Sequence, residues 1–374
     1  MSAEQPNPWQ DARRILCIRL DSLGDVLMCT PAIRALRASL PGCHLTLLTS
    51  PAAAAVAPHI PELDAVIGYA APWMKHEAPS GAGALLDCAA RLATERFDGA
   101  VIFTSYSQSP LPAALLCHLA EIPLRLASCR EHPYQLLSHW VPESEPERAT
   151  RHEVQRQLDL VARIGCTTDD TTISFAVPPA AAARVAELLT QAGIDPQAPY
   201  LMLHAGGSAA ARRYPIRHWL VLIGLLGTHV GYPIILTGDQ VESESLRPLA
   251  ETWLGPAHSL IGKLNLGELG ALIRSASLLI TGNTAPAHIA AAVGTPLLDL
   301  YALTNPQHTP WRVAHRLLFH DVDCRNCLRS SCPQRHHACL DALSPRTVLD
   351  AAVELLASAP PRPARTIDTP LAFV

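Results

Sequence analysis

The sequence is poor in features that would point to several classes of protein. Aromatic residues make up only 5% of the 374 positions, which disfavours a surface for stacking nucleic-acid bases. No apolar run is long enough to cross a bilayer, and the opening stretch MSAEQPNPWQDARR lacks the apolar segment of a secretory signal. The net charge of −4 also argues against a nucleic-acid partner. We therefore expect a soluble, cytoplasmic protein that binds no nucleic acid.

The chain does contain enough apolar residues for two large cores. Hydrophobic residues account for 49% and charged residues for 17% of the sequence, as in ordinary globular proteins. A length of 374 residues suits two domains better than one. We expect a first domain over 1–170 and a second over 171–345, then a helix at 346–358 that packs back toward the first domain. The proline-rich tail, 359–374, is expected to be flexible.

Short apolar runs alternate with helical patterns in both halves. In the first half the expected strands and helices lie at 14–20, 44–49, 65–69 and 99–103, and at 25–40 and 81–95. In the second half they lie at 200–204, 233–237, 278–281 and 296–301, and at 217–229, 241–253 and 285–293, after one helix in the join. This alternation predicts an α/β fold with a parallel sheet in each half, whose ligands bind beyond the carboxyl ends of the strands.

The first strand leads into RLDSLGDVL, where two acids flank a very short turn. Gly24 permits a backbone conformation or a close approach that other residues would not allow. Asp25 follows where the next helix begins, and a helix start favours a negative charge. Asp25 is therefore either a helix N-cap, for which aspartate is a preferred residue, or a general base. We interpret Asp21 as a turn residue.

The loop AGGSAAARR follows the strand at 200–204 and has the composition of a diphosphate site. Gly206 and Gly207 expose backbone N–H groups, Ser208 adds a hydroxyl and Arg212 a guanidinium. The loop is not a P-loop, because the GxxxxGK[ST] spacing is absent. A flexible surface turn with solvated arginines is the alternative.

The loop TGNTAPAH joins the strand at 278–281 to the next helix. The free N–H groups of Thr284 and Ala285 lie at the helix start, where anions bind. His288 falls within the first turn, so it either faces the site or is a structural residue.

Taken together and in this order, these stretches resemble glycosyltransferase family 9, the heptosyltransferases of lipopolysaccharide assembly. The similar segments are LDSLGDVLMCTPAIRALR, LHAGGSAAARRYPIRHW, LTGDQVESE and ITGNTAPAHIAAAVGTPLLDLYALTNPQHTPW. The resemblance implies a GT-B fold, with two Rossmann-like doubly wound domains that face each other across a cleft. It implies an inverting transfer of a sugar, foremost heptose from ADP-heptose, to a lipopolysaccharide core or related saccharide acceptor. No cofactor is required for this transfer.

The resemblance also assigns roles to residues, with acceptor binding in the first domain and donor binding in the second. Asp25 would deprotonate the acceptor hydroxyl, and Arg212 would bind the diphosphate. Glu242 would hold the ribose. The residues implied at the donor are Ser22, Gly24, Gly207, Ser208, Arg212, Glu242, Asn283, Thr284, Ala285 and His288. A lipid-linked acceptor would bring the protein into peripheral contact with the inner face of the inner membrane.

Three positions depart from the family pattern. Arg212 replaces the usual lysine, so a planar fork replaces a point charge. Tyr214 stands where tryptophan is usual, and Asn283 stands where many members have aspartate, which leaves the identity of the donor sugar open. The alternatives to a transferase are a GT-B nucleotide-sugar epimerase or hydrolase and a non-catalytic protein that binds sugar nucleotides.

Four of the 11 cysteines, Cys324, Cys327, Cys332 and Cys339, fall within one short excursion of the second domain, 324–339. In a cytosolic protein this spacing favours a structural zinc or a single iron ion over disulfides. The alternatives are four reduced thiols in a surface excursion, or a redox role. The seven earlier cysteines are expected to be small buried hydrophobic residues.

Overall fold

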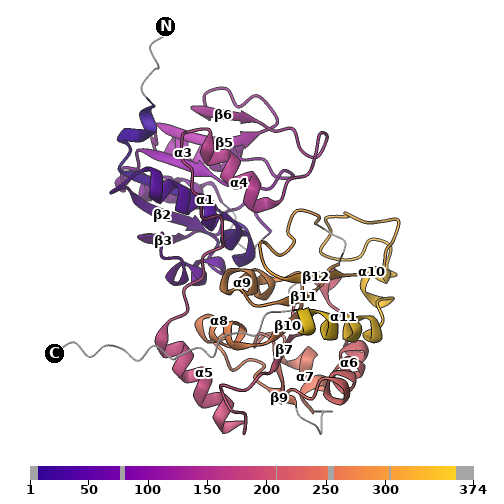
Figure 1. Cartoon of the computed structure of the whole chain (residues 1–374). Helices are drawn as coiled ribbons and strands as arrows, with labels where there is room; N and C mark the ends of the chain where they lie inside the picture. Colours follow the sequence, from indigo (N-terminus) through magenta and orange to yellow (C-terminus); the bar gives the residue numbers. More distant parts are fainter. Residues whose placement is uncertain (1–6, 76–80, 208, 252–256, 303–304, 359–374) are drawn as a thin grey trace, which may run out of the picture. The chain divides into compact units, whose positions relative to one another are not determined.

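The computed structural model describes residues 7–75, 81–207, 209–251, 257–302 and 305–358 (Figure 1). The chain divides into two compact units, Met1–Ala176 and Val177–Val374. The division falls a few residues after the expected boundary at 170. Each unit contains one sheet of six parallel strands. Ser208 and the expected tail, 359–374, lie outside the described residues.

The sheet of the first unit has the strand order β3-β2-β1-β4-β5-β6. Its strands are β1 (Arg14–Arg19), β2 (His44–Thr49), β3 (Ala65–Gly68), β4 (Gly99–Ile102), β5 (Leu124–Cys129) and β6 (His139–Pro142). The two central strands are buried along nearly their whole length, because helices cover both faces of a doubly wound sheet. The chain reverses its direction of travel across the sheet between β1 and β4, and ligands of such sheets bind at this point.

The helices of the first unit pack on this sheet and on each other. They are α1 (Leu23–Ser39), α2 (Ala82–Thr94), α3 (Leu111–Leu119) and α4 (Glu153–Ala162), with 3-10 turns η1 (Pro8–Asp11) and η2 (Ala53–His59). α1 packs against α4, and α2 against α3. The position of α4 matters for the site, because it brings Glu153 to Arg19 at the end of β1, which is 134 positions earlier in the sequence.

The sheet of the second unit has the order β12-β11-β10-β7-β8-β9, which is the same winding as in the first unit. Its strands are β7 (Leu201–His204), β8 (Ile234–Thr237), β9 (Ala257–Ser259), β10 (Leu278–Gly282), β11 (Leu297–Leu300) and β12 (His315–Leu318). The direction of travel reverses between β7 and β10. The two loops with the composition of an anion site follow these two strands.

The helices of the second unit are α5 (Pro179–Gln191), α6 (Ile216–His229), α7 (Ser243–Glu251), α8 (Leu266–Ser275), α9 (Ala285–Val293), α10 (Ala338–Asp341) and α11 (Pro345–Ser358). The final helix was expected to pack toward the first domain. Its apolar face, with Val348, Leu349, Ala352 and Leu355, belongs to the core of the second unit, where α11 contacts α6 and β12. The amphipathic pattern predicts that a helix has a buried face but does not show which core buries it.

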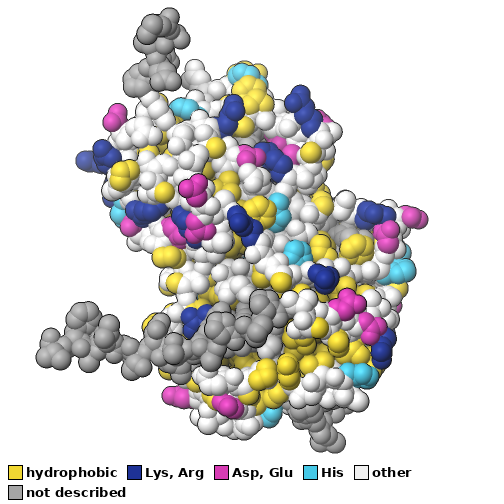
Figure 2. Space-filling view, in the orientation of Figure 1, with side chains coloured by type: hydrophobic (Ala, Val, Ile, Leu, Met, Phe, Trp, Pro, Cys, Tyr) yellow, Lys and Arg dark blue, Asp and Glu magenta, His cyan; other side chains and the backbone are white. Residues whose placement is uncertain are grey.

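Among the described residues, we find no helix whose length and apolar content would let it span a bilayer. On the face drawn in Figure 2, acidic and basic side chains are scattered among each other and do not form one patch of a single sign. This agrees with the balanced formal charge of the sequence.

Candidate functional site

The polar cluster of the first unit lies where β1 ends and α1 begins. Ser22 is the N-cap residue of α1, and Asp25 lies within its first turn. Asp25 Oδ2 accepts hydrogen bonds from Ser22 N at 3.1 Å and from Ser22 Oγ at 2.6 Å. Asp25 is therefore not itself the N-cap, although its carboxylate binds the N-cap residue as the third residue of a capping box does. Gly24 lies buried in the same turn and does not have the positive φ that would require glycine.

A buried arginine holds the other oxygen of Asp25. Arg19, the last residue of β1, is 1% exposed, and its guanidinium forms ion pairs with Asp21 Oδ2 at 2.8 Å, Asp25 Oδ1 at 3.1 Å and Glu153 Oε1 at 2.6 Å. Glu153 is fully buried on α4, where Gln157 Nε2 also donates to its Oε1 at 2.8 Å. The Asp25 side chain keeps 14% exposure. Its carboxylate is thus fixed from inside the unit and accessible from outside.

Asp21 has a different environment from Asp25, although both contact Arg19. Gln108 Nε2 donates to Asp21 Oδ1 at 2.5 Å, and Ser50 Oγ donates to its carbonyl at 2.8 Å. Burial raises the pKa of the Asp21 carboxyl, and the charge of Asp25 adds to this rise against the opposing effect of Arg19. Asp21 is therefore a member of a buried charge cluster as well as a turn residue.

In the second unit, Glu242 connects the loops that follow β7 and β8. Gly207 N donates to Glu242 Oε1 at 2.5 Å, and Asp239 N donates to Oε2 at 3.3 Å. A Cβ atom at Gly206 would lie 1.9 Å from Glu242 Oε2, so only glycine permits this approach. Glu242 orders the backbone of the loop, and its carboxylate has further lone pairs that can accept a ligand hydroxyl.

Arg212 lies at the end of the loop after β7, in the 3-10 turn η3 (Ala210–Arg212). Its Nη2 donates to Asn305 Oδ1 at 3.0 Å, whereas its buried Nε has no hydrogen-bond partner among the described residues. Arg213, in contrast, donates from Nε to Gly207 O at 2.6 Å and so closes the loop on itself. Of the two neighbouring arginines, Arg212 is the one with a buried donor that has no partner among the described residues.

The start of α9 lies against this loop. A Cβ atom at Gly207 would lie 3.5 Å from Thr284 Cγ2, and one at Gly282 would lie 2.9 Å from Arg212 O. Thr284 is the N-cap residue of α9, but its side chain does not cap the helix, because its Oγ1 donates to Gly282 O at 3.2 Å. The N–H groups of the first turn, including that of Ala285, are thus left without a side-chain cap. A helix N-terminus of this kind, beside an arginine, suits a phosphate.

Buried polar side chains lie close to this anion site. Asn283 is 2% exposed, and its Nδ2 has no hydrogen-bond partner among the described residues. His288 is 4% exposed on α9, which fits the structural alternative better than a residue that faces a ligand. The sequence motif TGNTAPAH points to both positions but does not predict their burial, because polar residues at a helix start can point either way.

Asp299 was missed by the sequence analysis. It lies in β11 with no exposed surface, and neither carboxyl oxygen has a hydrogen-bond partner among the described residues. Burial raises the pKa of Asp299 well above its ordinary value, against the opposing charge of Arg212. Burial therefore disfavours a negative charge on Asp299 beside Arg212. The signal in the sequence was a single acid within the otherwise apolar run LLDLY.

His204, at the end of β7, allows a prediction about pH. Its Nδ1 lies 3.1 Å from Thr237 Oγ1, and burial lowers its pKa from 6.5 to about 4. Between pH 6.5 and pH 4 the imidazole of His204 binds a proton in the unfolded chain but not in the folded chain. The contribution of His204 to the free energy of unfolding is therefore fully present above pH 6.5 and is lost as the pH falls toward 4.

We expect His204→Gln to weaken the loss of stability between pH 6.5 and 4 by up to about 3 kcal/mol. The measurement is urea unfolding of the wild type and the variant at several pH values, because their difference removes the contribution of the other titrating groups. Parallel curves for the two proteins would contradict this assignment.

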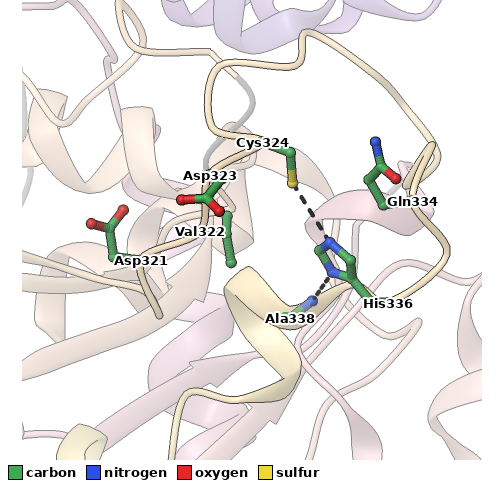
Figure 3. Close-up of a pocket in the computed structure, with 7 residues that line it drawn as sticks. All are labelled: Asp321, Val322, Asp323, Cys324, Gln334, His336 and Ala338. Carbon is green, nitrogen blue, oxygen red and sulfur yellow. Dashed lines mark hydrogen bonds between the residues drawn. The ribbon is translucent and has the colours of Figure 1, made fainter.

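The four cysteines of the excursion are free thiols with intermediate exposure. Figure 3 shows Cys324 and His336 pointing toward each other beside a pocket of about 400 Å3, with 3.7 Å between Sγ and Nε2. His336 Nδ1 accepts a hydrogen bond from Ala338 N at 2.9 Å. Two of the other thiols have different surroundings. Cys332 Sγ accepts a hydrogen bond from His337 N at 3.4 Å, and Cys339 packs against the apolar core of the second unit.

The expected zinc or iron site is therefore not supported by the structure. Within the part of the chain that the structure describes, no group of three or more histidine, cysteine or acidic side chains is placed to hold a metal ion. Cys324, Cys327, Cys332 and Cys339 have the spacing of a ligand set, but Cys339 lies on α10 with its side chain turned to the core, while the others lie in the preceding loop. Spacing in the sequence could not reveal this difference in direction.

Comparison with known proteins agrees with the geometry. Residues 89–338 match the family described as "Glycosyltransferase family 9 (heptosyltransferase)". The chain is 26% identical over 300 residues to lipopolysaccharide heptosyltransferase 3 of Escherichia coli, with 77% of this chain and 83% of that protein covered.

Two solved structures have the same fold. The glycosyl transferase family 9 protein from Veillonella parvula matches with a TM-score of 0.76 and 21% identity, covering 93% of this chain and 98% of that one. The E. coli ADP-heptose lps heptosyltransferase II matches with a TM-score of 0.70 and 20% identity over 92% and 98% of the two chains. The expected GT-B fold, with two Rossmann-like domains in one chain, is confirmed.

Proposed function

Because the chain belongs to glycosyltransferase family 9, we propose that it transfers a heptose from ADP-heptose to a saccharide of the lipopolysaccharide core, with inversion at the anomeric carbon. The donor is inferred from the E. coli ADP-heptose lps heptosyltransferase II, and the acceptor from that protein and lipopolysaccharide heptosyltransferase 3. The enzyme works without a catalytic cofactor. An acceptor of this kind places it at the cytoplasmic face of the inner membrane in peripheral contact with lipid.

The observation that carries this proposal is the anion site of the second unit. The loop that contains Arg212 lies against the start of α9, at the carboxyl end of the sheet. Arg212 Nε has no hydrogen-bond partner among the described residues, and the first turn of α9 has no side-chain cap. In a glycosyl transfer the leaving diphosphate gains negative charge as the bond to the sugar breaks, and donors that are already in place stabilise this charge. Glu242, which stands beside Gly207, holds a ribose hydroxyl of the same nucleotide.

Asp25 of the first unit is the base of the proposed reaction. Its carboxylate takes the proton of the acceptor hydroxyl as the acceptor oxygen forms a bond to the anomeric carbon. The bond from that carbon to the diphosphate oxygen breaks on the opposite side, and the electron pair leaves with ADP. Arg19 and Ser22 hold the two oxygens of Asp25, so that little reorganisation is needed for proton transfer.

A thermal-shift screen of the full chain against ADP-, GDP- and UDP-sugars tests the donor. A ligand that binds only the folded state raises the stability, by about 2.7 kcal/mol at a hundredfold excess over Kd. We expect ADP-heptose to raise Tm more than the GDP- and UDP-sugars do. No shift with any nucleotide sugar would contradict the proposal.

Arg212→Ala is expected to weaken donor binding by about tenfold to a hundredfold, because a hydrogen bond to a charged group is lost. Isothermal titration with ADP-heptose measures the change. Arg247→Ala is the matched control, since Arg247 is 64% exposed on α7 and pairs only loosely with Glu251. Equal donor affinities of the Arg212 variant and the wild type would exclude Arg212 as a ligand of the diphosphate.

A further inference from the structure

The excursion that contains the cysteines contacts the loop that contains Arg212. Both segments belong to the second unit, and the contacts come from the end of the excursion and from the turn after α10. We propose that residues 330–343, here called the brace, hold the Arg212 loop in place for the nucleotide-sugar donor, with His337 as a positioning residue. This inference rests on the proposed function, because it takes Arg212 as a ligand of the donor.

The brace binds both backbone polar groups of Ala211, the residue before Arg212. Ala211 N donates to Ser330 O at 2.9 Å, and His337 Nε2 lies 2.8 Å from Ala211 O. Since a carbonyl oxygen only accepts, Nε2 of His337 must carry the hydrogen. Ala211 is 4% exposed, so both bonds are shielded from water at the loop. The backbone next to Arg212 is therefore fixed from the side of the brace.

The conformation of His337 is itself fixed by the cysteine segment. His337 has a left-handed backbone with φ of 49°, and it is the residue from which α10 begins. Its N–H donates to Cys332 Sγ at 3.4 Å. This bond fixes the direction of the peptide that precedes the His337 side chain. The thiol of Cys332 thus acts on the Arg212 loop through one histidine.

Two further contacts join the same segments beyond Arg212. Tyr214, which is 3% exposed, donates from its hydroxyl to Leu343 O at 2.9 Å. Arg217, at the start of α6, forms an ion pair with Asp341 on α10. Four contacts therefore link residues 211–217 to the brace, and three of them end on a backbone carbonyl oxygen and involve a buried residue, Ala211 or Tyr214.

The other side of Arg212 lies against the sheet. Its carbonyl oxygen lies 2.9 Å from the position of a Cβ at Gly282, at the end of β10. The backbone next to Arg212 is thus held between β10 and the brace. A loop that is ordered in advance loses less conformational entropy when the donor binds. Loosening the brace should raise the Kd and the KM for the donor and leave kcat little changed.

The test compares two neighbouring histidines. His337→Ala removes the bond to Ala211 O, whereas His336→Ala removes only the contacts with Cys324 and Ala338. We expect His337→Ala to raise the Kd for ADP-heptose about threefold to tenfold, as for the loss of one hydrogen bond. We expect His336→Ala to stay within about twofold of the wild type. In His337→Gln the side-chain amide N–H can replace Nε2–H, so this variant should recover part of the lost affinity for ADP-heptose. It also replaces the alanine variant in the test if that variant does not fold.

Hydrogen exchange provides a readout that needs no ligand. The peptide that covers residues 209–214 should exchange faster in His337→Ala than in the wild type and His336→Ala. Unchanged exchange would refute the brace, and faster exchange with unchanged donor affinity would refute its role in donor binding. If the wild-type chain binds no nucleotide sugar at all, the proposed function fails, and the donor role of the brace fails with it. The exchange result identifies which of the two ideas has failed.

Discussion

Replacing Asp25 by asparagine is expected to lower kcat by about a hundredfold to ten-thousandfold, which is the usual contribution of a general base. The amide keeps the size of the side chain, and its oxygen can still accept the hydrogen bonds from Ser22. Donor affinity should be unchanged, because Asp25 belongs to the first unit and the proposed diphosphate ligands belong to the second. The measurement is ADP release at saturating donor and acceptor.

Asp21→Asn is the matched control for this prediction. Asp21 contacts the same arginine and lies in the same loop, but its pKa is raised by burial, and Gln108 occupies its second oxygen. We expect kcat to stay within about threefold of the wild type, because no proton transfer depends on Asp21. A large loss of kcat in Asp21→Asn, with a near-normal kcat in Asp25→Asn, would show that Asp21 and not Asp25 is the base.

Replacing Arg19 by methionine is expected to lower the free energy of unfolding by about 3–5 kcal/mol. The reason is Glu153, a carboxylate with no exposed surface whose charge would lose its cation and keep only the bond from Gln157. Urea unfolding of the full chain measures the change, with the signal of the first unit followed separately because the chain has two compact units.

Two comparisons isolate the buried charge as the cause. Arg184→Met makes the same chemical change in an exposed pair, where the side chains of Arg184 and Glu187 are 47% and 63% exposed, and should cost well under about 1 kcal/mol. Adding Glu153→Gln to Arg19→Met should recover a large part of the loss, because the charge that was left unpaired is removed. A double variant as unstable as Arg19→Met would show that lost packing is the cause.

Most strands that the sequence revealed are largely buried, although β3 is mostly exposed at the edge of its sheet and the inner strand β5 was missed. The runs ILCI, LTLL and LMLH lie in β1, β2 and β7, where nearly every residue is buried. β6 and β12 were missed because they have partly exposed, mixed sequences, HWVP and HRLL, at the edges of their sheets. α3 was missed because its sequence LPAALLCHL is apolar all round and so has no helical period.

The loops after β1, β7 and β10 could be found from the sequence, because glycine, acidic residues and arginine directly after a buried strand are typical of a ligand site. Their partners could not be found in the same way. Glu153 lies in an ordinary charged helix sequence, and Asp299 is a single acid in a strand. Each of these acids is buried near an arginine that is distant in the sequence. Glu153 pairs with Arg19, and Asp299 interacts with the charge of Arg212. Such pairs depend on how helices and strands pack, which local pattern does not encode.

The most direct test of the proposed heptosyl transfer is to incubate the purified chain with ADP-heptose, with and without a lipopolysaccharide core acceptor, and to follow ADP and the sugar products. We expect ADP release that depends on the acceptor, with a heptosylated product whose anomeric configuration is opposite to that of the donor. Free heptose or an isomerised donor without an acceptor would contradict the transfer and indicate a hydrolase or an epimerase. Binding of ADP-heptose with no product under either condition would also contradict it.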